Sequence, residues 1–352
     1  MTDEGDDRLE GSGSRRRRRG PAEPVSVWKE RENLDGKIVE AGVIILRTSG
    51  CSHSKDGGCT MCGYNLESSE DVSQADLVAQ FRSASKRLED TRMLKLYTSG
   101  SFLDDREVSP ETREEIVGWC KEHGQRLLFE SRTEYITAEK MGSVLGTHED
   151  IEVAIGLESA NDKVLKYAIN KNMTVADFDR AATTVKSAGA KLRAYILLKP
   201  PFLTEAEAIE DAISTGRDAA LKSDTISINP VNVQKGTVVE RLWKTWSYRP
   251  PWLWSVIEVL NASAELDRKV VCDPTGGGKE RGAHNCGGCD DDALTAIRDF
   301  SLNQTGAKIE LDDCECRQLW ETVRELEGLV VGGTPDLQRL YRDRSKRRPE
   351  HH

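Results

Sequence analysis

The sequence predicts an α/β protein: a partial (β/α)6 barrel of the TIM type with a helical, cysteine-containing C-terminal extension. From Val39 onward, short β-type apolar runs alternate with longer helical patterns. Six such alternations suit a parallel sheet, because parallel strands need crossover connections, which are usually helical. Beyond about residue 232 the alternation stops, and Trp-rich and cysteine-bearing segments follow.

Local residues support each predicted element. The predicted strands are six short apolar segments: Val39–Leu46, Met93–Thr98, Arg126–Glu130, Ile151–Leu157, Lys191–Leu198 and Thr225–Val231. The predicted helices between them span residues 72–90, 110–123, 137–145, 162–188 and 204–222. Pro110 suits the first turn of its helix, and Thr204-Glu-Ala-Glu begins another as a capping box. Gly124 and Gly189 lie where two of these helices should end.

We expect four segments along the chain. They are a disordered charged tail (1–24), the barrel (36–235), the extension (236–330) and a basic tail (331–352). Within the extension, helices are predicted at Thr237–Trp243, Pro251–Ala264, 290–302 and 313–327. The run Arg15–Arg19 in the first tail can either remain solvated or bind RNA phosphates.

The composition restricts the class of protein. The 352 residues include 37% hydrophobic residues, enough for a substantial core, and carry a formal net charge of −10. No apolar run reaches membrane-spanning length and no signal peptide is evident, so we expect a soluble, cytoplasmic protein without a membrane partner. An acidic surface normally disfavours nucleic acid, although local patches can still be basic. Nine cysteines without an export signal indicate metal or cluster ligation in a reducing compartment.

The first cysteine motif follows the first predicted strand directly. It consists of Cys51, Cys59 and Cys62, spaced C-x7-C-x2-C. Three thiolates on one loop fill three iron positions of a 4Fe–4S cluster, and we expect the open fourth iron to bind S-adenosylmethionine (SAM). Gly57 and Gly58 let the backbone curl round a bulky cofactor. A zinc site completed by His53 and a disulfide framework are the alternatives.

Polar residues lie at the carboxyl ends of successive predicted strands. The candidate cofactor contacts among them are Ser99, Gly100, Glu130, Glu158, Arg193 and Lys199. The carboxyl ends of barrel strands usually carry the chemistry of the fold. Gly100 would let the backbone approach the methionyl group of SAM, Glu158 can reach a ribose, and the two cations suit a carboxylate. Each residue alone is equally consistent with a surface salt bridge or a turn, but their repetition favours a ligand site.

A second cysteine group lies in the extension. It consists of Cys286, Cys289, Cys314 and Cys316, a C-x2-C pair and a C-x-C pair that can close a tetrahedral zinc site. Such a site would tie residues 265–290 to the last helices, with His284 and Cys272 as possible substitute ligands. A second iron–sulfur cluster and unligated buried cysteines are the alternatives. Cys120, within a predicted helix, is expected in the core.

Together these motifs resemble those of radical-SAM enzymes. The blocks are the first cysteine motif, Thr98-Ser-Gly-Ser-Phe, Glu130-Ser-Arg-Thr-Glu-Tyr, Gly156-Leu-Glu-Ser and Asn229-Pro-Val-Asn-Val-Gln-Lys-Gly-Thr. The branch that includes the elongator catalytic subunit carries similar blocks. The sequence is most similar to the archaeosine synthase radical-SAM subunit family, through Cys59-Thr-Met-Cys-Gly-Tyr, His284-Asn-Cys-Gly-Gly-Cys-Asp and Asp313-Cys-Glu-Cys. The resemblance covers roughly residues 36 to 327. Family loops commonly carry an aromatic residue at the position of Met61, so either Met61 or Tyr64 would lie against adenine.

The resemblance implies a reaction and its partners. A reduced cluster would cleave SAM to methionine and a 5′-deoxyadenosyl radical, which removes hydrogen from an unactivated carbon. The implied enzyme is a lyase that cleaves the C–N bond of a lysine adduct of 7-cyano-7-deazaguanine in the tRNA D-loop, leaving archaeosine. The implied partners are the tRNA, the lysine-transferring archaeosine synthase alpha subunit and an electron donor. The alternatives are another radical-SAM RNA-modifying enzyme, either a methylthiolase or elongator-like, and a non-catalytic zinc RNA-binding protein.

Overall fold

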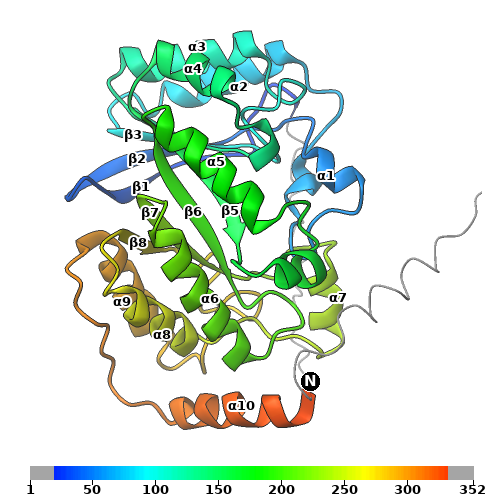
Figure 1. The fold of residues 1–352 in the computed structure, drawn as a ribbon, viewed down its shortest axis with the longest axis vertical. Helices are drawn as coiled ribbons and strands as arrows, with labels where there is room; N and C mark the ends of the chain where they lie inside the picture. Colours follow the sequence, from blue (N-terminus) through cyan, green and yellow to red (C-terminus); the bar gives the residue numbers. More distant parts are fainter. Residues whose placement is uncertain (1–19, 332–352) are drawn as a thin grey trace, which may run out of the picture.

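The computed structural model describes residues 20–331, in which one open, curled sheet carries helices along its outer face (Figure 1). Its eight strands lie in sequence order, from β1 to β8. β1 (Ser26–Leu34) pairs antiparallel with β2 (Lys37–Ile45), and all later pairs are parallel. Because every crossover moves to the next position in the same direction, the sheet curls into a half barrel. The predicted fold class is therefore confirmed. The predictions for Arg15–Arg19 and for residues 332–352 lie outside the described residues.

Six strands agree with the predicted ones within two residues at either end. Besides β2 they are β3 (Met93–Tyr97), β4 (Arg126–Glu130), β5 (Ile151–Glu158), β6 (Lys191–Leu198) and β7 (Thr225–Pro230). The sequence pattern does not predict β1 or the short β8 (Lys269–Cys272). Asp35 and Gly36, with φ of 51° and 84°, form the turn from β1 to β2, and an Asp-Gly pair is a known hairpin signal.

The helices lie along the outer face of the sheet and beyond it (Figure 1). They are α2 (Gln74–Ser85), α3 (Pro110–Glu122), α4 (Ala138–Thr147), α5 (Val175–Ser187), α6 (Glu205–Ala220), α7 (Val238–Lys244), α8 (Leu253–Ser263), α9 (Asp290–Asn303) and α10 (Glu315–Val331). Short helical turns are α1 (Ser52–Lys55), η1 (Tyr64–Glu67) and η2 (Thr133–Tyr135). The capping box at Thr204 is confirmed. Within residues 20–331, no helix combines the length and apolar character needed to cross a membrane.

The single helix predicted over residues 162–188 is wrong. A π-helical turn, η3 (Val164–Ile169), ends at Asn170, whose φ of 59° is left-handed. α5 begins separately, after a capping box formed by Thr174 and Asp177. Asn tolerates the left-handed conformation that ends the first helix. Thr174, as a capping residue, favours the start of a second helix over one continuous helix.

Successive side chains along each strand point to opposite faces of the sheet, one packed against the helices and one facing the concave side. Outward side chains such as Leu94, Leu96, Val153 and Ile155 are buried against the helices in the main hydrophobic core. Burial of each such side chain stabilises the fold by roughly 1.5–3 kcal/mol. Their inward neighbours face the concave side, where the apolar cluster consists only of Ala41, Met93, Leu128 and Ala154 with three partly buried residues around it. The concave face is therefore mostly available for polar groups.

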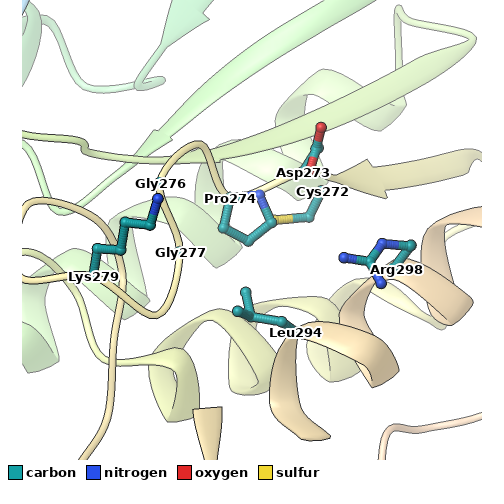
Figure 2. Close-up of a pocket in the computed structure, with 8 residues that line it drawn as sticks. All are labelled: Cys272, Asp273, Pro274, Gly276, Gly277, Lys279, Leu294 and Arg298. Atoms are coloured by element: carbon teal, nitrogen blue, oxygen red, sulfur yellow. The ribbon is translucent and has the colours of Figure 1, made fainter. Parts of the chain in front are cut away.

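β8 leads into a glycine-rich loop that lines a cavity of about 270 Å³ together with α9 (Figure 2). The lining residues are Cys272, Asp273, Pro274, Gly276, Gly277, Lys279, Leu294 and Arg298. The loop folds back on itself, since a Cβ atom on Gly282 would lie 2.2 Å from the Gly276 carbonyl oxygen. Glycine is therefore required at this close approach.

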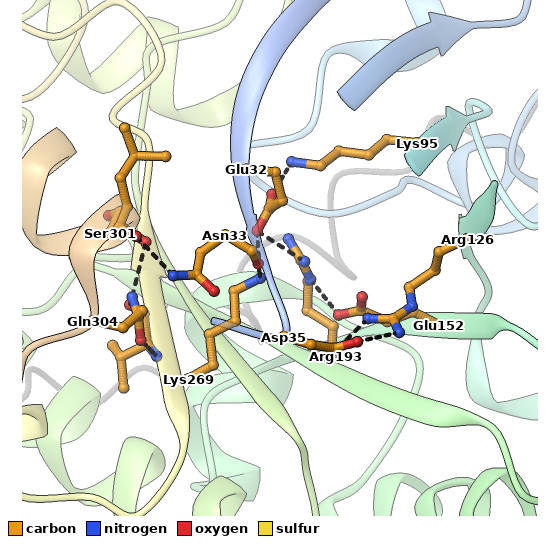
Figure 3. Close-up of polar contacts among 12 residues, drawn as sticks. Glu32, Asn33, Asp35, Lys95, Arg126, Glu152, Arg193, Lys269, Ser301 and Gln304 are labelled. Atoms are coloured by element: carbon orange, nitrogen blue, oxygen red, sulfur yellow. Dashed lines mark hydrogen bonds and ion pairs between the residues drawn. The ribbon is translucent and has the colours of Figure 1, made fainter. Parts of the chain in front are cut away.

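Charged side chains fill the concave face toward the amino ends of the strands (Figure 3). Arg193 donates from Nε to Glu152 Oε1 at 2.8 Å, and its Nη2 lies 3.5 Å from Glu32 Oε1. Glu32 also pairs with Lys95 and Lys269. Although burial raises the pKa of Glu32, these three cations hold it well below its usual range. The buried carboxylates are thus compensated by several cations at once.

We expect Arg193→Met to lower the free energy of unfolding by about 3–5 kcal/mol, because it leaves buried carboxylates without their shared cation. Urea denaturation of the full chain, followed by circular dichroism, measures this change. The matched control is Lys191→Met on the same strand and face, where the partner Asp35 is 59% exposed and also pairs with Arg126. That control should cost less than about 1 kcal/mol. Equal losses in the two variants would contradict the prediction.

Candidate active site

The cysteine loop lies at the carboxyl edge of the sheet, between β2 and α2, where Cys51, Cys59 and Cys62 are all free thiols. It packs closely against the turn that follows β3. A Cβ atom on Gly100 would lie 2.8 Å from Cys51 Cα and 2.3 Å from Glu107 Oε2. Glu107 itself is buried and accepts hydrogen bonds from Thr48 Oγ1 and the Ser101 backbone N–H. Gly100 therefore serves the close approach of these two segments.

Backbone hydrogen bonds fasten the cysteine loop to the end of η3. The Thr60 N–H donates to the Ile169 carbonyl at 2.8 Å, and Asn170 Nδ2 donates to the Gly58 carbonyl at 2.7 Å. His53 Nε2 lies 2.7 Å from the Asn170 carbonyl. That nitrogen donates to the carbonyl, which leaves the other ring nitrogen, Nδ1, as the one with a lone pair for a metal. Within residues 20–331, however, His53 belongs to no group of three or more ligand atoms within 4.8 Å of one another, which weighs against the zinc site completed by His53.

The three thiols suit a cluster better than a single ion. In the described part of the chain, only the second cysteine group has three or more ligand atoms within 4.8 Å of one another. A tetrahedral zinc ion with bonds of about 2.3 Å requires sulfurs this close. The three thiols still share one environment: burial raises the pKa of Cys59 to about 12, Lys171 opposes this rise, and the charges of Cys62 and Cys51 add to it. Partly buried thiols on one loop that do not lie close enough for a single zinc ion suit an iron–sulfur cluster.

An ion pair lies beside the thiols at the end of β5. Lys171 Nζ donates to Glu158 Oε1 at 2.7 Å, and Glu158 has a left-handed φ of 65°. A Cβ atom on Gly156 would lie 2.3 Å from that carboxylate oxygen and 2.5 Å from Lys171 Nζ. Glycine is therefore needed for the pair to lie over the strand. A strained acidic residue held in this way is typical of a functional site.

Glu130 ends β4 on the same concave face. Burial raises the pKa of its carboxyl group to about 7, a hydrogen bond from Tyr195 lowers it, and the nearby Glu158 raises it. Its backbone carbonyl accepts from the Phe102 N–H at 2.9 Å, which joins β4 to the turn after β3. Glu130 can therefore change its protonation state near neutral pH.

Tyr64, Ser99 and Arg132 complete the rim around the cysteine loop. Tyr64 is 54% exposed, and its carbonyl accepts from Ser99 Oγ at 3.4 Å. Arg132 Nη1 donates to Ser52 Oγ at 3.0 Å and lies 3.7 Å from Cys51 Sγ. The structure thus brings five predicted residues together around the three thiols: Tyr64, Ser99, Gly100, Glu130 and Glu158.

Two predicted cofactor contacts lie elsewhere. Arg193 belongs to the buried ion pairs at the amino half of the concave face. Lys199 is buried and pairs with Glu205 at the start of α6. Both cations already pair with buried carboxylates, which weighs against the prediction that they bind a ligand carboxylate. Two residues beside the thiols are missing from the predicted cofactor contacts. Lys171 falls inside the helix predicted over residues 162–188, and Arg132 lies in the Glu130-Ser-Arg block but is not among the predicted contacts.

The second cysteine group is a four-thiol group formed by Cys286, Cys289, Cys314 and Cys316. The Sγ–Sγ distances are 3.9 Å (286–289), 3.7 Å (286–314), 3.6 Å (289–316) and 3.4 Å (314–316). Such distances fit the edges of a tetrahedron with metal–sulfur bonds of about 2.3 Å. Trp254 Nε1 lies 3.2 Å from the sulfur of Cys316, and Asn285 Nδ2 lies 3.3 Å from that of Cys289. These donors stabilise thiolates, as outer hydrogen bonds commonly do in metal sites.

The four-thiol group ties the extension together. It joins the loop before α9 to the start of α10, which packs on α8. Trp320 Nε1 donates to Ser255 Oγ at 2.8 Å, and Arg324 pairs with Glu258 at 2.7 Å. Neither possible substitute takes part, because Cys272 lies buried in β8 and no ring nitrogen of His284 belongs to the group of ligand atoms within 4.8 Å of one another.

The chain is similar to two curated archaeal proteins over almost all its length. It is 42% identical over 324 residues to archaeosine synthase subunit beta of Methanosarcina acetivorans, covering 90% of this chain and 93% of that protein. It is 40% identical over 313 residues to archaeosine synthase subunit beta of Thermococcus kodakarensis, covering 86% and 97%. The solved structure of methylornithine synthase shares the fold, with a TM-score of 0.51 and 14% identity over 81% of each chain. No protein-family model matches the chain.

We expect Gly100→Ala to reduce the iron bound after anaerobic reconstitution severalfold. The added Cβ meets the backbone of Cys51 at 2.8 Å, and no side-chain rotation can relieve that contact. Iron and sulfide analysis measures the loss. The matched control is Gly118→Ala in α3, where a Cβ has nothing within 4 Å. It should keep its iron and gain up to about 1 kcal/mol of stability. Full iron content in Gly100→Ala would show that the loop tolerates the displacement.

Proposed function

The chain belongs to the archaeosine synthase beta-subunit family of the radical-SAM superfamily, and on that premise we propose that it is the lyase of archaeosine formation in tRNA. In this proposal it cleaves the C–N bond of a lysine adduct of 7-cyano-7-deazaguanine in the D-loop, leaving archaeosine. The supporting observation is the convergence of three free thiols with Glu130, Glu158 and Lys171 at one end of a half barrel.

We propose that Cys51, Cys59 and Cys62 hold a 4Fe–4S cluster. The donor set fits, because the three thiols are free, influence one another electrostatically and lie on a loop with positive-φ glycines. With SAM, such a cluster supplies a 5′-deoxyadenosyl radical that removes hydrogen from an unactivated carbon. Arg132 places a positive charge 3.7 Å from the Cys51 sulfur, which stabilises the thiolate form.

The surrounding residues would bind and orient SAM. Glu130 would offer its carboxyl group to the cationic part of SAM, and Glu158, whose Oε1 already pairs with Lys171, would offer its other oxygen, while Ser99 and Gly100 lie beside the loop. Tyr64 is the better candidate to lie against adenine, because this residue is half exposed whereas Met61 packs against the core. The ion pairs at the amino half of the concave face would exclude water from that side of the SAM site.

We also propose a heteromeric complex. Both curated relatives are named as a beta subunit, so an alpha subunit that attaches the lysine is the expected partner. The tRNA carrying the adduct is the substrate, and a separate electron donor supplies the single electron that reductive cleavage of SAM consumes.

The test of the proposed function combines the reconstituted protein and its alpha partner with SAM, a low-potential reductant and tRNA carrying the lysine adduct. We expect archaeosine by nucleoside mass spectrometry, together with 5′-deoxyadenosine. Cys59→Ala should form neither, because the cluster loses a ligand. Cys120→Ala, at a buried thiol in α3 outside the site, is the control that should retain both products. Deoxyadenosine with a different modified nucleoside would support another radical-SAM RNA-modifying enzyme.

We further propose that the four-thiol group holds a structural zinc ion. Metal analysis should then give about one zinc per chain, since a tetrahedral thiolate site takes one ion. Cys286→Ser/Cys314→Ser should lose zinc but keep iron at the first motif. Cys59→Ala should do the reverse, which makes each variant the control for the other. Iron that disappears with the double variant would instead indicate an iron site at this group.

A further inference from the structure

None of the residues that line the cavity beyond β8, which Figure 2 shows, belongs to either cysteine group. We propose that this cavity binds a phosphate of the RNA backbone, so that this chain itself helps to position the tRNA beside the cysteine loop. This inference rests on the proposed function, from which it takes the polynucleotide. The groups that carry it are Lys279 and Arg298, with Asp273 as the acidic side chain among the lining residues.

The two cations flank the cavity and are available to a ligand. Both residues are exposed, and they come from different segments, the loop after β8 and helix α9. Within residues 20–331 neither side chain forms a hydrogen bond or close ion pair with another residue, although Arg298 acts electrostatically on Asp273. Two such cations around one cavity are notable in a chain of net charge −10. They provide the positive charge that a phosphodiester requires.

The loop that carries Lys279 suits the close approach of a ligand to its backbone. Gly276 and Gly278 have left-handed φ of 69° and 72°. The Gly278 N–H donates to the Ala283 carbonyl at 2.9 Å, which holds the turn in place. A Cβ atom on Gly277 would lie 2.6 Å from Leu294 Cδ2. A side-chain-free turn after the last strands is where α/β barrels often bind phosphate.

Contacts along the carboxyl rim connect this cavity to the cysteine loop. Arg281, in the same glycine-rich loop, pairs with Glu240 of α7, and its carbonyl accepts from the Val233 N–H at 2.7 Å. The next residue, Gln234, accepts from the Gly63 N–H at 2.5 Å, directly after Cys62. A polynucleotide held at the cavity would therefore lie on the same rim as the thiols.

An exposed indole favours RNA over a small free anion. Trp246 follows α7 and is 96% exposed, so it contributes little to the core. Lys235, Arg241 and Lys244 are exposed in the same segment, and Lys244 lies 3.4 Å from Glu240. Aromatic side chains stack on unpaired bases with about 1–3 kcal/mol per base. A phosphate pocket, with an exposed indole on the segment whose Glu240 pairs with Arg281 of the glycine-rich loop, suits a nucleic acid strand, while a free phosphate would need only the pocket.

The test compares Lys279→Ala/Arg298→Ala with a control, Arg92→Ala/Lys121→Ala, which removes the same charge from exposed positions before β3 and on α3. Binding of labelled tRNA to the reconstituted full chain is measured at several salt concentrations. We expect the cavity variant to lose about tenfold in affinity. Its plot of log affinity against log salt should become shallower by about one, since the single phosphate contact contributes roughly 0.7–0.9 to the slope. The control should change affinity by less than about twofold.

A separate variant tests the stacking platform. Trp246→Ala should weaken tRNA binding by about fivefold or more without changing the salt slope, because stacking on a base displaces no counterions. An unchanged affinity in this variant would remove the reason for preferring RNA to a small anion.

Three results would overturn the inference. If the cavity variant bound tRNA as tightly as the wild-type protein, the cavity would bind no RNA phosphate. If the control lost the same affinity, the effect would come from the overall loss of positive charge. Binding of GMP or inorganic phosphate that only the cavity variant loses, with tRNA binding intact, would identify a small-anion site. Deoxyadenosine formation from SAM without RNA should remain at the wild-type level in the cavity variant. A failure of the proposed function appears separately, as wild-type protein that forms no archaeosine.

Discussion

Ion pairs across the concave face join the two edges of the open sheet, and the position of the site depends on them. Glu32 of β1 meets Lys269 of β8, and Lys269 also donates to the Asn33 carbonyl (Figure 3). β1 and β8 end the sheet and share no ladder, so side chains close the half barrel where backbone hydrogen bonds do not. Paired charges occupy the amino half of this face, which leaves its carboxyl half, where the cysteine loop lies, for a ligand. The desolvation cost of these charges is offset by multiple pairing.

The cysteine loop depends on a break in the chain far from it in sequence. Had residues 162–188 formed one helix, Asn170 would lack its left-handed conformation and could not bond the Gly58 carbonyl. The same break delivers Lys171 to Glu158. One irregular turn therefore both fastens the thiol-bearing loop and supplies the cation beside it. Irregular backbone of this kind is common at functional sites, where the surrounding structure holds it in place.

A buried polar chain links the barrel to the extension. Lys199 at the end of β6 pairs with Glu205, which accepts from the Trp252 N–H and from Ser255. Ser255 in turn accepts from Trp320 of α10, next to the four-thiol group. The cation that strand position suggested for a cofactor thus holds the extension against the barrel. Since buried polar groups are stable only when satisfied, each member of this chain constrains the next.

Local pattern alone determined the strand–helix alternation, the capping box at Thr204 and the two cysteine groups, because each depends on residues close together in sequence. Tertiary structure decided which polar side chains share the site. Glu32 and Lys269 meet across 237 residues, and no local pattern contains that pairing. Arg193 and Glu130 both point to the concave face from their strands. Arg193 is neutralised at the amino half of the sheet, whereas Glu130 lies at the end of β4, near Glu158 and Lys171. The depth of a side chain along its strand, and the charges opposite it, exist only once the sheet has curled.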